Sequence, residues 1–360
     1  MNKPKINLGK LFGINISIDR SWFIILAITL YSFYFANRVL VPYQTFFFYS
    51  AVALLQTIVF NMSIILHELG HAIVARKHGI PIDSITLFML GGVSNISREP
   101  EKPITELKMS FSGPLVSLII GTIFVLISMV PVSNNFIIVP VFGILGYLNL
   151  FMGIFNLLPG FPLDGGRILR SFIWAKTKDL TIATKIATNF GKFVGGALVI
   201  LGVIEFILNM TLSGPWLIII GFFIYQSAKS SMRQYLLLAK LEKIRVGDFF
   251  ERNVIWADPD ELTSEVMRRM MLMHTKIALT KSGEKVIGIF YFTPKAQLDS
   301  MIKQVAYSVK TLCHVSANDP MKKALEGITR SNCLAIPVLE NGEIVGAISF
   351  DDIDFALAVR

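Results

Sequence analysis

Two histidines and a glutamate stand close together in the stretch IILHELGHAIVARKHG, which runs from Ile64 to Gly79. His67 and His71 are four residues apart, so on a helix their imidazoles share one face and can both reach a single tetrahedral zinc ion. Glu68 directly follows the first histidine and can take a proton from a water that the metal activates. The stretch therefore predicts a metal site with two histidine ligands and an adjacent base.

The surroundings of these residues strengthen that prediction, because the stretch otherwise has the composition of a membrane span. An ionisable side chain in such a span costs at least ~2.5 kcal/mol. Three of them together are hard to explain as a structural polar cluster, which is the alternative interpretation. The spacing HExxH is also the general pattern of zinc peptidases.

Two histidines leave a zinc site one protein ligand short, and the sequence NLLPGFPLDGGR contains a candidate for the third. Asp164 is the only carboxylate in residues 107–178. We expect Gly165 and Gly166 to break the helix there and to let the backbone turn the aspartate inward. The alternative is that Asp164 caps a helix that begins near Gly165.

His67 and Asp164 are expected at a similar depth in the membrane. His67 lies nine residues before Arg76, which on a helix is roughly 13 Å. Asp164 lies just before Arg167, so both sites fall near the same basic end of their segments.

The composition of the chain predicts a membrane protein. Its 360 residues are 53% hydrophobic and only 16% charged, whereas soluble domains carry about 25% charged residues. A spanning helix needs roughly 20 apolar residues, and six segments approach that length: 22–36, 46–73, 109–132, 136–158, 193–208 and 215–227. The sequence PVSNN at 131–135 supplies a turn between the third and the fourth. We expect a multi-span α-helical membrane domain of about six transmembrane helices over residues 1–235.

The Lys and Arg residues predict the orientation of these helices. They cluster at 3–20, 76–108, 167–185 and 229–243, while the alternate loops carry only Arg38. By the positive-inside rule, we expect a multi-pass protein of the cell membrane with both termini in the cytoplasm and the active site towards the cytoplasmic face. Topology and contact with the anionic lipid bilayer then explain the net charge of +9. We expect no nucleic acid as a partner.

From about residue 241 the composition changes to that of a soluble cytoplasmic α/β tandem repeat. IALTKSGEKVIGIF and AIPVLENGEIVGAIS each contain two apolar strands joined by a short polar turn. Asn341 and Gly342 in the second are a strong signal for a type I′ hairpin turn.

HELGH in the second segment and NLLPGFPLDG in the fourth together resemble the site-2 protease family of intramembrane zinc metalloproteases. The resemblance covers roughly residues 7–230, including LGKLFGINISIDRSW and FSGPLVS at 111–117. It implies one zinc ion per chain held by His67, His71 and Asp164, with Glu68 as the catalytic base. It also implies that Asn156 orients the substrate or stabilises the oxyanion. The alternative for Asn156 is a hydrogen bond to a neighbouring helix.

The stretch SITLFMLGGVSNIS at 84–97 is rich in strand formers and resembles the re-entrant β-hairpin of the same family, with Gly91 and Gly92 at the expected turn. A transmembrane substrate hides its carbonyl groups in helical hydrogen bonds, so it must unwind locally before cleavage. We predict that this hairpin binds the unwound substrate by strand addition. The alternative is an ordinary cytoplasmic hairpin.

The tandem repeat resembles a pair of CBS domains, the cystathionine-β-synthase type, at 241–300 and 305–360. Such pairs often bind adenine nucleotides through a glycine, two hydrophobic residues, Ser or Thr and, three residues later, Asp. The second copy, GAISFDD, fits this pattern with Ser349 and Asp352, whereas the first copy, GIFYFTP, departs from it at Tyr291 and Pro294. The resemblance implies an adenine nucleotide as a candidate ligand. The alternative is a homodimerisation module without a ligand.

The sequence thus favours an intramembrane zinc endopeptidase that hydrolyses a peptide bond within or near the transmembrane segment of a membrane-protein substrate, regulated by the CBS pair. The alternative is a CBS-regulated transporter or channel that uses its intramembrane polar residues for ions.

Overall fold

The computed structural model describes residues 6–88, 91–96, 100–130, 138–209, 213–283, 285–292, 297–309, 312–331 and 333–359. They form two compact units, Met1–Met232 and Arg233–Arg360, whose boundary falls within helix α7 (Ser213–Lys243). The expected turn PVSNN and the residues Thr293 and Pro294 of the first GIFYFTP copy lie outside the described residues.

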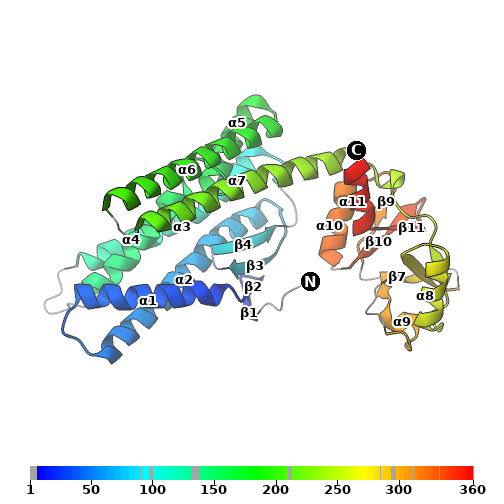
Figure 1. The fold of residues 1–360 in the computed structure, drawn as a ribbon, viewed down its shortest axis with the longest axis horizontal. Helices are drawn as coiled ribbons and strands as arrows, with labels where there is room; N and C mark the ends of the chain where they lie inside the picture. Colours follow the sequence, from blue (N-terminus) through cyan, green and yellow to red (C-terminus); the bar gives the residue numbers. More distant parts are fainter. Residues whose placement is uncertain are drawn as a thin grey trace. The chain divides into compact units, whose positions relative to one another are not determined.

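Long helices make up most of the first unit (Figure 1). In chain order they are α1 (Trp22–Leu40), α2 (Phe46–Lys77), α3 (Pro103–Ser128), α4 (Ile138–Asn156), α5 (Asp164–Thr177), α6 (Leu180–Asn209) and α7.

Five helices of the described chain, α1, α2, α3, α4 and α6, are long and apolar enough to cross a membrane. They contain the predicted segments 22–36, 46–73 and 193–208 and most of 109–132 and 136–158, which extend beyond the ends of α3 and α4. The sixth, 215–227, forms the first part of α7, which does not reach the same apolar length because its apolar part is short and Lys229 and Arg233 follow it. α5 is short and amphipathic, with polar and basic residues among its apolar ones.

Glycines allow α3 and α4 to pack closely. A Cβ atom at Gly121 of α3 would lie 2.7 Å from the backbone nitrogen of Leu150, and one at Gly146 of α4 would lie 2.8 Å from that of Val125. Small residues at a helix crossing let two backbones approach in this way within a membrane. α3 also contacts α2, so it packs against both of these helices.

A four-stranded sheet lies beside α2 in the same unit (Figure 1). Its order is β1 (Ile6–Leu11), β2 (Ile14–Ile18), β3 (Ile82–Phe88) and β4 (Gly91–Ile96), with β2 parallel to β3 and the other pairs antiparallel. Alternate residues of β2 are buried, and the buried faces of β2 and β3 pack against Ile65, Leu69 and Ala72 of α2. The sequence predicted the β3–β4 hairpin but not the two N-terminal strands.

The hairpin differs from the prediction in its turn. Gly91 and Gly92 begin β4, where they pair with Phe88 and Leu87, instead of forming the turn itself. The two residues between the strands, 89 and 90, lie outside the described residues.

The second unit contains two copies of a strand–helix–hairpin pattern. The first has β5 (Ile255–Ala257) parallel to β6 (Ile277–Ser282), which pairs antiparallel with β7 (Lys285–Tyr291); helix α8 (Thr263–Leu272) lies between β5 and β6 in the chain. The second repeats this with β9 (Val315–Ser316), α10 (Met321–Ser331), β10 (Ala335–Glu340) and β11 (Glu343–Ser349), followed by α11 (Phe350–Val359). Shorter elements are η1 (Val246–Asp248), α9 (Ile302–Val305) and β8 (Tyr307–Ser308).

One buried core joins the two copies, with Leu279 and Ile289 of the first and Val338 and Ile348 of the second among its members. The β10–β11 turn has positive φ values at both Asn341 and Gly342, which confirms the predicted type I′ hairpin.

Candidate metal centre

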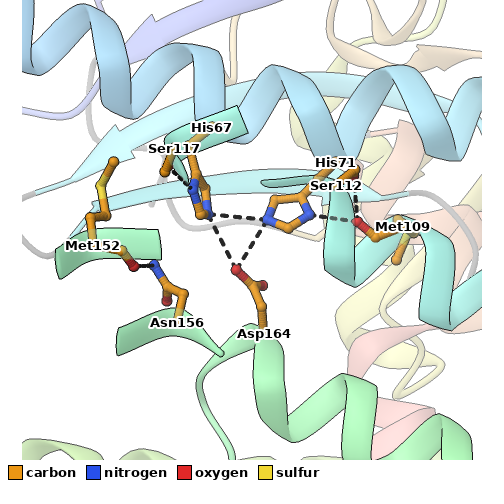
Figure 2. Close-up of polar contacts among 8 residues, drawn as sticks. All are labelled: His67, His71, Met109, Ser112, Ser117, Met152, Asn156 and Asp164. Carbon is orange, nitrogen blue, oxygen red and sulfur yellow. Dashed lines mark hydrogen bonds and ion pairs between the residues drawn. The ribbon is translucent and has the colours of Figure 1, made fainter. Parts of the chain in front are cut away.

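Three predicted ligands from two helices meet at one point (Figure 2). His67 and His71 come from α2, and Asp164 is the first residue of α5, although it lies 97 residues after His67 in the chain. The two Nε2 atoms are 3.3 Å apart, and each lies 3.2 Å from Oδ2 of Asp164. The side chains of His67, His71 and Asp164 are only 6%, 12% and 18% exposed.

This triangle of donor atoms fits a zinc ion. Bonds of about 2.0–2.2 Å in a tetrahedral arrangement separate two ligand atoms by about 3.3 Å. The remaining ring nitrogens have partners of their own: Nδ1 of His71 lies 2.7 Å from the backbone oxygen of Met109, and Nδ1 of His67 lies 2.8 Å from Oγ of Ser117. Because a carbonyl oxygen only accepts, Nδ1 of His71 carries the hydrogen and Nε2 keeps its lone pair for a metal.

α3 forms one wall of this centre, and a glycine leaves room for it. A Cβ atom at Gly113 would lie 2.1 Å from Nε2 of His71 and 2.8 Å from Nε2 of His67, which is closer than real contacts allow. Any side chain at this position would therefore enter the space where the donor atoms meet. This is the structural role of the glycine in FSGPLVS, which also contains Ser117.

Asp164 reaches the histidines from the start of a helix. After α4 ends at Asn156, residues 157–163 form a loop, and α5 begins at Asp164 itself. The expectation that Gly165 and Gly166 break a helix is therefore wrong. These glycines instead let the first turn of α5 pack against the loop, since their Cβ atoms would lie 2.3 Å from the carbonyl oxygen of Leu157 and 2.4 Å from the carbonyl carbon of Gly160.

Glu68 lies between the histidine pair and the β3–β4 hairpin. Its side chain is partly buried, and a Cβ atom at Gly92 would lie 2.3 Å from Cγ of Glu68 and 3.0 Å from its Oε1. The backbone of β4 thus runs directly against the side chain of the predicted base.

Asn156 ends α4 and is partly buried (Figure 2). Its Nδ2 donates to the backbone oxygen of Met152, one turn earlier in the same helix, at 3.1 Å. This hydrogen bond therefore lies within α4 and does not reach a neighbouring helix, as the alternative interpretation had it.

The predicted nucleotide residues of the second repeat bond to each other. Both the backbone nitrogen and Oγ of Ser349 donate to Oδ2 of Asp352, at 2.8 and 2.7 Å. The backbone nitrogen of Asp352 in turn donates to Oγ of Ser349 at 3.4 Å, which completes a capping box at the start of α11. Burial raises the pKa of the Asp352 carboxyl above its ordinary value.

Next to that pair, a polar contact joins the two repeats. Lys276 of the first repeat forms an ion pair with Asp351 of α11, and the hydroxyl of Tyr291 donates to the same carboxylate at 3.0 Å. The hydrogen bond from Lys276 lowers the pKa of Asp351, while burial raises the pKa of the Tyr291 hydroxyl. Tyr291, the departure noted in the first copy, is thus a contact across the repeats.

Sequence reasoning did not identify three features of the centre: the hydroxyl of Ser117, the backbone oxygen of Met109 and the clearance at Gly113. The segment FSGPLVS was noticed only as a resemblance. A polar residue and a glycine in an apolar span facing HExxH are the signal that could have indicated them.

Comparison with known proteins decides the family. The model of peptidase family M50 matches residues 55–136 and 132–202, and the CBS domain model matches residues 301–359. Zinc metalloprotease MJ0392 of Methanocaldococcus jannaschii is 32% identical over 304 residues, which are 83% of this chain and 83% of that protein. The chain belongs to peptidase family M50, the site-2 protease family.

Two further matches cover about two thirds of this chain. The protein sll0528 of Synechocystis sp. is 32% identical over 246 residues, which are 68% of this chain but only 64% of that protein's length. Among solved structures, the site-2 protease from Methanocaldococcus jannaschii has 32% sequence identity and a TM-score of 0.46, covering 64% of this chain and 95% of that chain.

Membership establishes the coarse function of this site-2 protease. It is a multi-pass intramembrane zinc metalloprotease that carries a C-terminal CBS domain. The alternative of a transporter or channel is not supported by these matches.

Proposed function

We propose that His67, His71 and Asp164 hold one zinc ion and that Glu68 is the base with which this chain hydrolyses a peptide bond in the transmembrane segment of its substrate. The observation that carries the proposal is the triangle of donor atoms, with sides of 3.2 to 3.3 Å, that α2 and α5 form together. Of these two helices, α2 is long and apolar enough to span a membrane. When bound, zinc polarises the scissile carbonyl and lowers the pKa of a water to about 7.

Residues of the chain then transfer the proton of the attacking water and keep the ligands and the substrate in position. Glu68 takes the proton of the attacking water and gives it to the leaving amine, so that one C–O bond forms as the C–N bond breaks. Ser117 and the carbonyl oxygen of Met109 keep the two imidazoles oriented during this exchange. Asn156 orients the substrate or stabilises the oxyanion, since its Nδ2 donates one hydrogen to Met152 and has a second to offer.

We further propose that the substrate binds along β4. In the described part of the chain, β4 is at the edge of the four-stranded sheet, with β3 on its other side. Gly92 brings this strand against Glu68. An unwound substrate that pairs with β4 as an added strand satisfies its backbone hydrogen bonds and at the same time lies close to Glu68.

The proposed orientation places both termini and the metal centre towards the cytoplasm. It requires a sixth crossing, for which the first part of α7 is the candidate. That part packs closely on α6, since a Cβ atom at Gly202 would lie 2.7 Å from the carbonyl oxygen of Gly214. The Lys and Arg clusters at alternate ends support this topology, and water then enters from the cytoplasmic side.

For the CBS pair we propose regulation of cleavage, either through an adenine nucleotide held by Ser349 and Asp352 or through homodimerisation. The fit of GAISFDD to the nucleotide pattern supports the first. Titration of the full-length protein with AMP and ATP tests it: binding that is lost in Asp352→Ala supports a nucleotide site, and no binding at millimolar nucleotide leaves dimerisation, measured by light scattering, as the role.

The central proposal is tested with two variants in native membranes. Glu68→Ala should keep one zinc per chain, abolish cleavage and retain uncleaved substrates, which mass spectrometry then identifies. Asp164→Ala should lose zinc. Normal cleavage by Glu68→Ala contradicts the mechanism, and unchanged zinc in Asp164→Ala contradicts the ligand assignment.

A further inference from the structure

A buried ion pair ties the helix of Asp164 to the helix that supports the histidines. Arg170 of α5 donates through Nε to Oε1 of Glu106 on α3 at 2.7 Å, and its Nη2 also contacts that oxygen. The side chains of Glu106 and Arg170 are only 1% and 8% exposed. Two charges taken this far from water are costly to bury, and such a pair often adds little stability compared with apolar residues of similar size. Its presence is therefore better explained by geometry than by stability.

The two ends of the pair are rigidly connected to the metal centre. On α3, Glu106 lies one helical turn before Met109, whose carbonyl oxygen accepts from Nδ1 of His71. On α5, Arg170 lies six residues after Asp164 in the same helix, a distance of roughly 9 Å along the axis. The contact between Glu106 and Arg170 thus relates the position of His71 to that of Asp164.

A third contact fixes the loop that precedes Asp164. The guanidinium of Arg170 lies 5.3 Å from the ring centre of Phe161, and the backbone nitrogen of Phe161 donates to the carbonyl oxygen of Ala187 on α6 at 3.2 Å. A Cβ atom at Gly191 would lie only 1.9 Å from the carbonyl oxygen of Phe161. Arg170 is therefore the point at which α3, α5 and this loop are held together.

We propose that Arg170 is a positioning residue of this protease: its pair with Glu106 sets where α5 rests on α3, and hence where the carboxylate of Asp164 stands relative to His67 and His71. The proposal rests on the ligand assignment made above. The contacts of Arg170 are with Glu106 and Phe161, so it acts on the centre through the placement of α5 and Asp164.

The test measures the metal site itself, in the full-length protein in lipid nanodiscs. Zinc affinity is obtained by competition with a chromophoric chelator, and the absorption bands of substituted Co²⁺ report the ligand geometry. Removing both charges together, in Glu106→Leu/Arg170→Met, avoids leaving one buried charge alone. We expect zinc affinity to fall about 10- to 100-fold and the Co²⁺ bands to shift, with little change in the melting temperature of the protein in excess chelator.

Two companion variants sharpen the result. Arg170→Lys keeps the positive charge but loses the planar guanidinium group, so we expect an intermediate loss of zinc affinity. If the double variant does not fold, Arg170→Lys serves as the test in its place. The exposed pair Arg252–Glu340 is the matched control, and Arg252→Gln/Glu340→Gln should leave zinc affinity unchanged.

The outcomes are separable. Parental zinc affinity and Co²⁺ bands in a folded double variant, or in Arg170→Lys, overturn the positioning role. If the free energy lost in zinc binding is matched by an equal loss in the free energy of unfolding in excess chelator, the pair is structural. That result also overturns the positioning role. Asp164→Ala in the same titration tests the ligand assignment: parental affinity there defeats the proposed centre and not merely the role of Arg170.

Discussion

The Nδ1 nitrogen of His71 lies 2.7 Å from the backbone carbonyl oxygen of Met109. The second histidine of HExxH is therefore oriented by the main chain of α3, and not by a side chain. Because no substitution removes a backbone carbonyl, the orientation of His71 depends on where α3 lies. Changes that displace α3 should consequently appear first as changes in zinc binding.

Gly113→Ala is the most direct such change. Its Cβ atom would lie 2.1 Å from Nε2 of His71, so either the ring or α3 must move, and we expect zinc to fall well below one per chain. Elemental analysis of the purified protein measures this. Gly143→Ala on α4 is the control, since the nearest atom to its Cβ is 3.9 Å away. A full complement of zinc in Gly113→Ala would contradict the role assigned to this glycine.

Ser117→Ala should weaken zinc binding without abolishing it. The substitution removes the Oγ atom that lies 2.8 Å from Nδ1 of His67, and loss of such an outer partner costs about 10-fold or more in metal affinity. Chelator competition measures the change. Ser128→Ala serves as control, because its hydroxyl donates to the carbonyl oxygen of Val125 in its own helix. Equal affinities in the two variants would show that Ser117 does not support the ligand.

Gly92→Ala should separate catalysis from metal binding. A Cβ atom there would lie 2.3 Å from Cγ of Glu68 and would displace the base, while the three donor atoms stay in place. We expect cleavage to drop about 100-fold or more, as a misplacement near 1 Å can do, with zinc retained. Cleavage in proteoliposomes and elemental analysis of one sample test this. Loss of zinc as large as in Gly113→Ala would refute the distinction.

The contact between the CBS repeats should depend on pH in a defined way. The hydrogen bond from Lys276 lowers the pKa of Asp351, and that carboxylate raises the pKa of Lys276. The pair therefore stabilises the fold fully between about pH 4 and pH 10. Its contribution is lost as pH falls through the lowered pKa of Asp351 or rises through the raised pKa of Lys276.

Lys276→Met should accordingly speed hydrogen exchange in α11 at neutral pH and have little effect in strong acid. Both side chains are more than half exposed, at 60% and 53%, so the effect should not exceed ~1 kcal/mol. Exchange in the full-length protein measures it. Lys303→Met, which removes the exposed partner of Asp260 in the first repeat, is the control. An effect of Lys276→Met that is unchanged in strong acid would rule out the ion pair as its cause.

Several elements could be predicted because their signal is local. The HExxH spacing needs only one helix, the apolar segments need only composition, and the Asn341–Gly342 turn needs only two residues that tolerate positive φ. The expected break at Gly165–Gly166 and turn at Gly91–Gly92 were wrong for one reason: a glycine signals close approach as readily as a change of direction. At Gly92, Gly165 and Gly166 the structure shows close approach.

The sequence by itself determined the kinds of residues at the proposed metal centre, the apolar helices and the two strand–helix–hairpin repeats of the second unit, because residue type and spacing along one element are enough to indicate these. Only the tertiary structure decided that Gly113 leaves room for the imidazoles, that a backbone oxygen of α3 orients His71 and that Glu106 and Arg170 join α3 to α5. The parallel pairing of β2 with β3 was likewise decided only by the tertiary structure. Backbone contacts and pairings between distant segments depend on where whole elements come to rest, and they leave no pattern in neighbouring residues.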